Sequence, residues 1–164
     1  MDTNPYESAD ATTLAEIIRQ AESRLAGQLQ AAIAADQRAL TFSGLLVASI
    51  AALAAVVGTA KDPPLPAVLV ATLLGLGAAA ALWSARPTRW WFAGTEPFQW
   101  LPDLTDPAKR LHASMAEMAA HYDAALHCNS RSMRRAAWAM RISLGLTALS
   151  LLVVITWAWV KTLS

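Results

Sequence analysis

The amino-acid sequence predicts an all-α membrane protein with three transmembrane helices, of which the first and third extend into the cytoplasm as long packed helices. Three observations predict this fold. Three stretches contain no ionisable residue, namely 39–60, 63–85 and 142–160. Apolar residues recur at alternating spacings of four and three before the first and third stretches. Finally, basic residues lie almost entirely on one side of the three stretches.

Each charge-free stretch is long enough to cross a bilayer, because about 20 apolar residues in a helix span about 30 Å of hydrocarbon. The spans contain no Asp, Glu, Lys, Arg or His, the groups that mark ion and proton pathways, so a coupled transporter is disfavoured. Small residues four apart allow close helix packing, and they are Gly44, Ala48 and Ala52 in the first span and Ala71, Gly75 and Ala79 in the second. They suit packing within the chain or between copies, and we expect a homo-oligomer.

The basic residues set the orientation of the spans, because Lys and Arg are retained on the cytoplasmic side of short loops. Arg19, Arg24 and Arg38 precede the first span, eight more basic residues lie between the second and third, and only Lys61 and Lys161 fall on the other side. We therefore expect a cytoplasmic N-terminus and a C-terminus outside. The start of the chain is acidic and lacks the pattern of a cleavable signal, so the first span should also direct insertion.

Two helical segments, 12–38 and 107–141, are predicted in the cytoplasm. The first opens on a capping-box pattern, with Thr13 followed three residues later by Glu16. The second opens with Asp106 as N-cap and Pro107 at the first helical position. Each carries a heptad seam, formed by Leu14, Ile18, Ala21, Leu25, Gln28, Ala32, Ala35 and Ala39 in the first and by Leu111, Met115, Met118, Tyr122, Ala125, Asn129, Ser132 and Ala136 in the second. Both should continue into the adjoining spans, run parallel and pack seam to seam.

The segment between the second span and the second cytoplasmic helix, residues 87–105, is predicted to be an extended aromatic linker. Its prolines are incompatible with a helix interior, and they are Pro87, Pro97 and Pro102. Its aromatic residues, Trp90, Trp91, Phe92, Phe98 and Trp100, would dock it along the two cytoplasmic helices. For Trp90 and Trp91 a second interpretation stays open, because both could belong to the interfacial aromatic belt of a membrane protein.

Catalytic and metal chemistry find no support in the sequence. His112, His121 and His127 are spaced by nine and six on one predicted helix, which places no pair on a shared face. Cys128 has no cysteine partner, and the glycines do not form a phosphate-binding loop. The net charge of +1 disfavours a broad basic face for DNA or RNA. We therefore expect neither an enzyme nor a metal site nor a cofactor.

A strongly basic stretch lies just outside the membrane on the predicted cytoplasmic side. It comprises Arg131, Arg134, Arg135 and Arg141, facing Arg86, Arg89 and Arg38. These arginines could anchor the protein to anionic lipid headgroups and enforce its orientation. Alternatively, they could hold the phosphate of a soluble anion while an indole or guanidinium plane stacks on a base.

The sequence resembles the transmembrane effectors of bacterial Pycsar antiphage defence systems. The similar stretches are Ala35, Asp36, Gln37, Arg38 and Ala39 at the entry to the first span, Ser84, Ala85, Arg86 and Pro87 followed by Trp91, Phe92, Ala93 and Gly94 after the second, and His127, Asn129, Arg131, Arg134 and Arg135 before the third. They occur in the same order and spacing over about residues 35–160. Arg38 stands where lysine is expected, which replaces a point donor by a planar fork.

The resemblance implies a non-enzymatic effector of the bacterial inner membrane. Such a protein senses a cyclic pyrimidine mononucleotide, cCMP or cUMP, made by a partner nucleotide cyclase, and then impairs membrane integrity. The residues expected to bind the nucleotide are Asp36, Arg38, Arg86, Arg89, Trp90, Trp91, Asn129, Arg131, Arg134 and Arg135. The alternative is a membrane-anchored scaffold whose cytoplasmic seam binds a partner helix, with Gln28, Asn129 and Ser132 setting pairing specificity.

Overall fold

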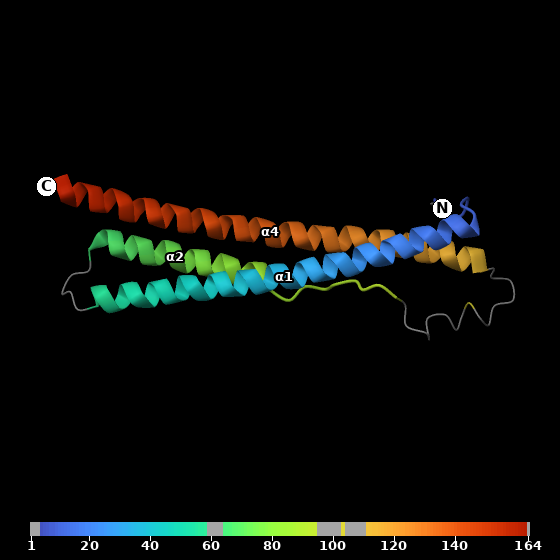
Figure 1. Cartoon of the computed structure of the whole chain (residues 1–164), viewed down its shortest axis with the longest axis horizontal. Helices are drawn as coiled ribbons and strands as arrows, with labels where there is room; N and C mark the ends of the chain where they lie inside the picture. Colours follow the sequence, from blue (N-terminus) through green and yellow to red (C-terminus); the bar gives the residue numbers. More distant parts are fainter. Residues whose placement is uncertain (1–3, 59–63, 95–102, 104–110, 164) are drawn as a thin grey trace. The chain divides into compact units, whose positions relative to one another are not determined.

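The computed structural model describes residues 4–58, 64–94, 103 and 111–163, and this part of the chain contains three helices and no strand. They are α1 (Ala11–Val57), α2 (Leu65–Ser84) and α4 (Leu111–Leu163), shown in Figure 1. Each is long and apolar enough to cross a membrane. The all-helical fold and the three candidate spans are therefore confirmed. The predicted ends shift slightly, since α1 stops at Val57 rather than at residue 60 and α2 covers two residues less at its start.

The chain divides into two compact units. Unit 1 contains Met1–Ala32 and Thr88–Ser132, and unit 2 contains Ile33–Pro87 and Met133–Ser164. Both α1 and α4 are continuous helices that contribute residues to each unit. Unit 2 therefore holds the charge-free part of every helix, and unit 1 holds most of the polar sequence.

The start of α1 is set by Asp10, not by the predicted capping box of Thr13 and Glu16. Asp10 Oδ1 accepts hydrogen bonds from the backbone N–H groups of Thr12 (2.9 Å) and Thr13 (3.0 Å), and Thr13 Oγ1 donates to Asp10 Oδ2 (2.6 Å). Glu16 instead accepts from Arg19 Nε at 2.8 Å. Because Asp caps a helix as well as Ser or Thr does, the acidic residue three positions upstream takes the role that the prediction gave to Thr13.

Acid should loosen this first part of α1. Hydrogen bonds from Arg19 and then Gln20 lower the pKa of Glu16 from its ordinary 4.5 to about 2, and those from Thr13 lower the pKa of Asp10. A depressed carboxyl pKa in the folded chain stabilises the fold above the ordinary pKa, and this contribution is lost as the pH falls towards the lowered one. We expect amide-exchange protection at residues 12–19 to decline between pH 4.5 and about 2.

The variant Glu16→Gln isolates this effect. It cannot ionise, so the part of the decline that belongs to Glu16 should be absent from its pH profile. An identical profile for the variant and the unchanged protein would show that the Glu16 pKa does not control this turn.

The core of unit 1 is the packed seam of α1 and α4. One buried cluster combines Ala21, Leu25, Tyr122 and Ala125, and a second combines Leu14, Ala116 and Ala119. Two predicted seam positions are wrong. Leu111 is 70% exposed, because the α4 seam begins at Met115. Ala35 is exposed while its neighbour Asp36 is half-buried, since the buried side of α1 shifts by one residue between Ala32 and Ala39.

Unit 2 packs α2 against both other helices. Its apolar cluster comprises Leu46, Val70, Leu74 and Ala78, with Phe42, Ile50, Leu53 and Val153 against it. Three serine hydroxyls tie the helices together by donating to carbonyls of a neighbouring helix: Ser43 to Ala78 (3.3 Å), Ser143 to Gly77 (2.6 Å) and Ser84 to Ala136 (3.0 Å). Such bonds satisfy the hydroxyls inside an apolar bundle and fix the register of the helices.

Candidate functional site

Asn129 binds the backbone of Trp91 through both ends of its side-chain amide. Its Oδ1 accepts a hydrogen bond from the Trp91 N–H (3.1 Å), and its Nδ2 donates to the Trp91 carbonyl (3.0 Å). The Asn129 side chain lies on the buried seam of α4 and is fully buried. Sequence reasoning placed Asn129 on the seam and in the candidate site, and the structure gives it a specific contact there. Asn129 thereby joins α4 to the segment that follows α2.

A second attachment lies three residues further along this segment. The Gly94 N–H donates to the hydroxyl oxygen of Tyr122 (3.0 Å), and the same hydroxyl donates to Glu22 Oε1 on α1 (3.0 Å). Gly94 has a φ of +90°, a conformation that side-chain-bearing residues rarely adopt, so glycine is needed here. Tyr122 is almost fully buried, and its hydroxyl connects three parts of unit 1. Residues 91–94 are called the clamped segment below.

The spacing of the two attachments explains why they fit. The three residue steps from Trp91 to Gly94 reach at most about 10 Å. The seven residues from Tyr122 to Asn129 rise by about 10.5 Å along a helix. Trp91 pairs with the later helical residue and Gly94 with the earlier one, so the clamped segment runs antiparallel to α4. One heptad of helix is therefore comparable in length to the reach of these three residue steps.

Two of the aromatic residues predicted to dock this segment, Trp91 and Phe92, are exposed. Trp91 and Phe92 remain 46% and 62% exposed, and the hydrogen bonds that hold the clamped segment come from its backbone. The Trp91 and His121 rings make a T-shaped contact, with centroids 5.2 Å apart and an interplanar angle of 73°. The predicted docking residues Phe98 and Trp100 lie outside the described residues. Trp91 thus combines a hydrogen-bonded backbone with partial exposure to solvent.

The other predicted site residues are divided between the units. In unit 1, Arg89 and Arg131 are exposed and Trp90 is half-buried. Arg131 follows Asn129 by two positions, and residues two apart on a helix do not share a face. The structure therefore brings Trp91 and Asn129 together and places Arg131 on another face of α4.

The remaining five predicted residues belong to unit 2. Asp36 is half-buried, and the arginines are exposed, namely Arg38, Arg86, Arg134 and Arg135. The Arg86 guanidinium lies over the ring of Trp83, 4.1 Å from its centroid. This cation–π contact holds Arg86 beside an indole that is itself exposed.

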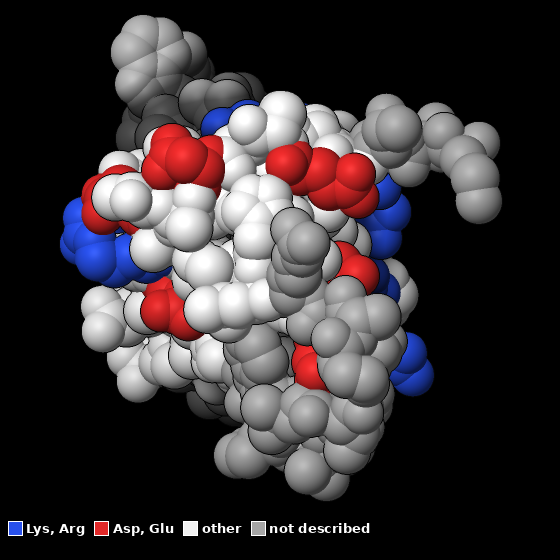
Figure 2. All heavy atoms as spheres, turned by 90° about the vertical axis from the view of Figure 1, so that its right-hand side faces the viewer, with Lys and Arg blue, Asp and Glu red and all other residues white. Residues whose placement is uncertain are grey.

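Acidic side chains dominate the charge of unit 1. Its sequence carries ten Asp and Glu residues against six Lys and Arg residues, a net charge of −4. In Figure 2, which faces the side where the N-terminal segment lies, acidic groups are scattered over the visible surface and basic groups appear at its margins. An anionic ligand would be repelled from this surface.

Sequence reasoning missed three contributors to the site. Glu22, His121 and Gly94 were not in the predicted set, although all three contact the clamped segment or its anchor. Gly94 carried a usable signal, since an isolated glycine after aromatic residues marks a position that needs special backbone geometry. Glu22 lies one position after seam residue Ala21, and nothing in its spacing indicated a tyrosine partner 100 residues away.

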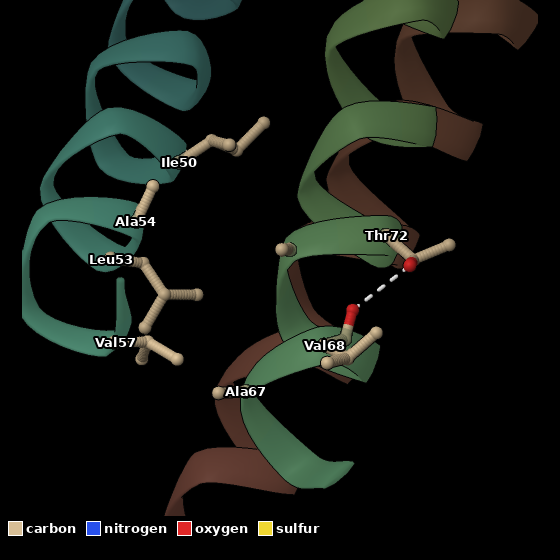
Figure 3. A pocket seen from close by; sticks show the side chains of 8 residues that line it. Ile50, Leu53, Ala54, Val57, Ala67, Val68 and Thr72 are labelled. Atoms are coloured by element: carbon tan, nitrogen blue, oxygen red, sulfur yellow. Dashed lines mark hydrogen bonds between the residues drawn. The ribbon is translucent and has the colours of Figure 1, made fainter. Parts of the chain in front are cut away.

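An apolar groove lies between α1 and α2 in unit 2, with a volume of about 400 Å³. Figure 3 shows its two walls, with Ile50, Leu53, Ala54 and Val57 on α1 and Ala67, Val68 and Thr72 on α2. The only hydroxyl in the lining, that of Thr72, donates to the Val68 carbonyl at 2.9 Å. Among the described residues, the lining of the groove is therefore almost entirely apolar.

Within the described residues, no three His, Cys, Asp or Glu side chains come together in a way that could hold a metal ion. Comparison of the chain with protein-family models, with curated proteins and with solved structures finds no match. The fold and the site therefore define the protein by its own features: three candidate membrane spans and a helical unit with a clamped extended segment.

Proposed function

We propose that this protein is a ligand-gated effector of the bacterial inner membrane, not an enzyme, that responds to a cyclic pyrimidine mononucleotide and impairs membrane integrity. The proposal places the N-terminus and unit 1 in the cytoplasm and the C-terminus outside, with homo-oligomers as the active form. A partner nucleotide cyclase would supply the ligand during phage infection. The resemblance to Pycsar effectors suggests the ligand class, and the charge distribution of the sequence suggests the orientation.

The observation that carries the proposal is the bidentate hold of Asn129 on Trp91. Its hydrogen bonds use the backbone of Trp91 and leave about half of the residue accessible to solvent. An exposed indole on a fixed backbone is a suitable stacking platform, because the backbone that carries it is already ordered before a base binds. Asn129 then acts as a positioning residue rather than a ligand contact.

The phosphate would be held by Arg89, two residues before Trp91. Alternate residues of an extended chain point to the same side, so Arg89 falls on the side of Trp91 while Trp90 falls on the other. Residues 87–92 have no helical or turn conformation, which suits this arrangement. A guanidinium makes paired, charge-assisted hydrogen bonds to phosphate oxygens, and a cyclic mononucleotide carries one phosphate.

Gating would follow from the connections of the clamped segment. Through Asn129 and Tyr122 the segment is bonded to α4, and through the Tyr122 hydroxyl to Glu22 on α1. Both helices also contribute candidate membrane spans. A ligand that binds one arrangement of these helices more tightly than another shifts their populations by its difference in affinity.

The scaffold alternative receives less support. It needs an open seam for a partner helix, whereas the seams of α1 and α4 in unit 1 bury each other. Gln28, proposed as a specificity residue, donates to Ser130 Oγ of the same chain at 3.0 Å. Asn129 is likewise occupied by Trp91.

Equilibrium binding of the detergent-solubilised protein to cyclic mononucleotides and dinucleotides tests the proposal. We expect one cyclic pyrimidine mononucleotide to bind selectively, and Trp91→Ala or Arg89→Gln to weaken it about tenfold or more, since stacking and charged hydrogen bonds each contribute about 1–3 kcal/mol. Arg24→Gln, an exposed arginine of α1, is the matched control and should bind normally. Absence of binding across the panel, or unchanged membrane integrity on co-expression with a cognate cyclase, would contradict the proposal.

A further inference from the structure

The two units carry opposite charge. Unit 2 has two acidic and seven basic residues, a net charge of +5, against −4 for unit 1, and together these give the +1 of the chain. Five of the seven basic residues of unit 2 are exposed arginines. In the sequence they lie near the boundaries with unit 1, and they are Arg38, Arg86, Arg134, Arg135 and Arg141. This group is called the arginine end of unit 2.

The serine hydrogen bonds show that most of these arginines lie at one level. The Ser143 hydroxyl donates to the Gly77 carbonyl, and the Ser84 hydroxyl donates to the Ala136 carbonyl. The second bond lies seven residues earlier on α4 and seven residues later on α2, so the two helices are antiparallel. Arg86 follows the end of α2 by two residues, and Arg134 precedes Ala136 by two residues on α4, so both arginines lie close to the level of this last hydrogen bond. The Ser43 hydroxyl of α1 donates to the Ala78 carbonyl of α2. Because these helices are antiparallel, Arg38, five residues before Ser43, lies level with Trp83, five residues after Ala78.

Exposed tryptophans accompany this level. Trp83 is 62% exposed and Trp138 is 65% exposed, and the register places Trp83 next to the level of Trp138. On α4, Trp157 follows Trp138 by nineteen residues, which is a rise of about 28 Å and close to the thickness of the hydrocarbon layer. Lys161 lies over the Trp157 ring at 5.0 Å, as Arg86 lies over Trp83. Indoles with a cation beside them therefore mark both ends of a bilayer-sized segment.

We infer that the arginine end of unit 2 binds the phosphate groups of anionic phospholipids. Within the described residues, no carboxylate lies within ion-pair distance of any of its five arginines. Four of them lie level with Trp83 and Trp138 or on the headgroup side of these tryptophans, where lipid phosphates begin. Arg141 lies about one helical turn closer to the centre of the bilayer, from where its long side chain can reach the headgroups. The opposite end offers only Lys161 on the described helices, so the preference for anionic lipid should be one-sided.

This inference rests on the membrane insertion of unit 2 that the proposed function includes, but not on nucleotide sensing. The ligand site proposed above uses Arg89 and Trp91 of unit 1, whereas the lipid site uses arginines of unit 2. If the protein prefers anionic lipid but binds no nucleotide, this inference stands and the proposed function fails. If it binds a nucleotide but shows no lipid preference, the proposed function stands and this inference fails.

Quenching of tryptophan fluorescence by brominated lipids tests the inference. The full chain is reconstituted in phosphatidylcholine bilayers that contain brominated phosphatidylglycerol or brominated phosphatidylcholine. The variant Trp157→Phe with Trp159→Phe removes the signal of the far end, and Trp83→Phe with Trp138→Phe removes that of the arginine end. At the arginine end we expect about a fivefold preference for phosphatidylglycerol, the equivalent of about one headgroup contact, and no preference at the far end.

The double variant Arg134→Gln with Arg135→Gln should lower this preference severalfold, while Arg19→Gln with Arg24→Gln, which removes the same charge from unit 1, should leave it unchanged. High salt should weaken the preference of the unchanged protein, a measurement that needs no variant to fold. Equal preference at both ends, or no response to the arginine substitutions or to salt, would overturn the inference. Loss of the preference in millimolar inorganic phosphate would also overturn it, by assigning the arginines to a free anion.

Discussion

Replacement of Asn129 by alanine should release the first attachment of the clamped segment. The change removes both hydrogen bonds to Trp91 and leaves a cavity in the seam of unit 1 where the amide group was. Loss of a buried amide with its partners costs about 1–3 kcal/mol, so the unfolding midpoint should fall. Hydrogen exchange should show the larger effect at one position, because the Trp91 amide loses its acceptor while the Gly94 amide keeps the Tyr122 hydroxyl.

A substitution at the second attachment of the clamped segment provides the control. Tyr122→Phe keeps the ring in the core and removes only the hydroxyl, so it should expose the Gly94 amide and spare the Trp91 amide. Cys128→Ala, at the exposed neighbour of Asn129, should change neither amide. If Asn129→Ala left the exchange rate of Trp91 unaltered, the clamp would not exist in solution.

Replacement of Gly77 by valine should strongly destabilise unit 2. Even a Cβ atom at this position would lie 3.3 Å from Leu46 Cδ1 and 3.5 Å from both the Ser143 carbonyl oxygen and Thr147 Oγ1. Two further methyl groups have no space between the three helices, so α2 must move away and strain the bond from Ser143. Overpacking of this kind costs about 1–3 kcal/mol, measurable as a lower thermal midpoint in detergent.

The matched control is Gly44→Val, since a side chain at Gly44 would meet nothing within 4 Å. Both variants make the same change in helix propensity inside a candidate span, so the difference between them reports packing alone. Equal midpoints for the two variants would mean that α2 does not approach its neighbours at Gly77 as closely as described.

The features that sequence could predict are those that depend on one helix at a time. Charge-free runs defined the three candidate spans, and the heptad spacing placed Leu14, Leu25 and Tyr122 in the core, because burial on a helix follows its period. The ends were less certain, since several capping patterns compete and Asp10 displaced Thr13. The seam shift at Asp36 was also out of reach, because an alanine-rich stretch gives nearly equal apolar choices at adjacent positions.

The site depended on contacts between distant parts of the chain. Asn129 was predicted as a site residue from its polar character on a seam, but its partner is the backbone of Trp91, and a backbone has no sequence signature. The same holds for the Tyr122 hydroxyl, which the seam pattern treated only as part of an apolar position. Pattern analysis could therefore suggest which residues matter and not what they bind.

The attachment of the clamped segment through its backbone has a consequence for its sequence. Surface connections usually tolerate insertions and deletions. Here the side chains of residues 92 and 93 are exposed, so substitutions should be accepted freely. The number of residues between Trp91 and Gly94 is another matter, because adding or removing one would separate an amide from Asn129 or Tyr122 by a whole residue length. Selection on this stretch should therefore act on its length and not on its composition.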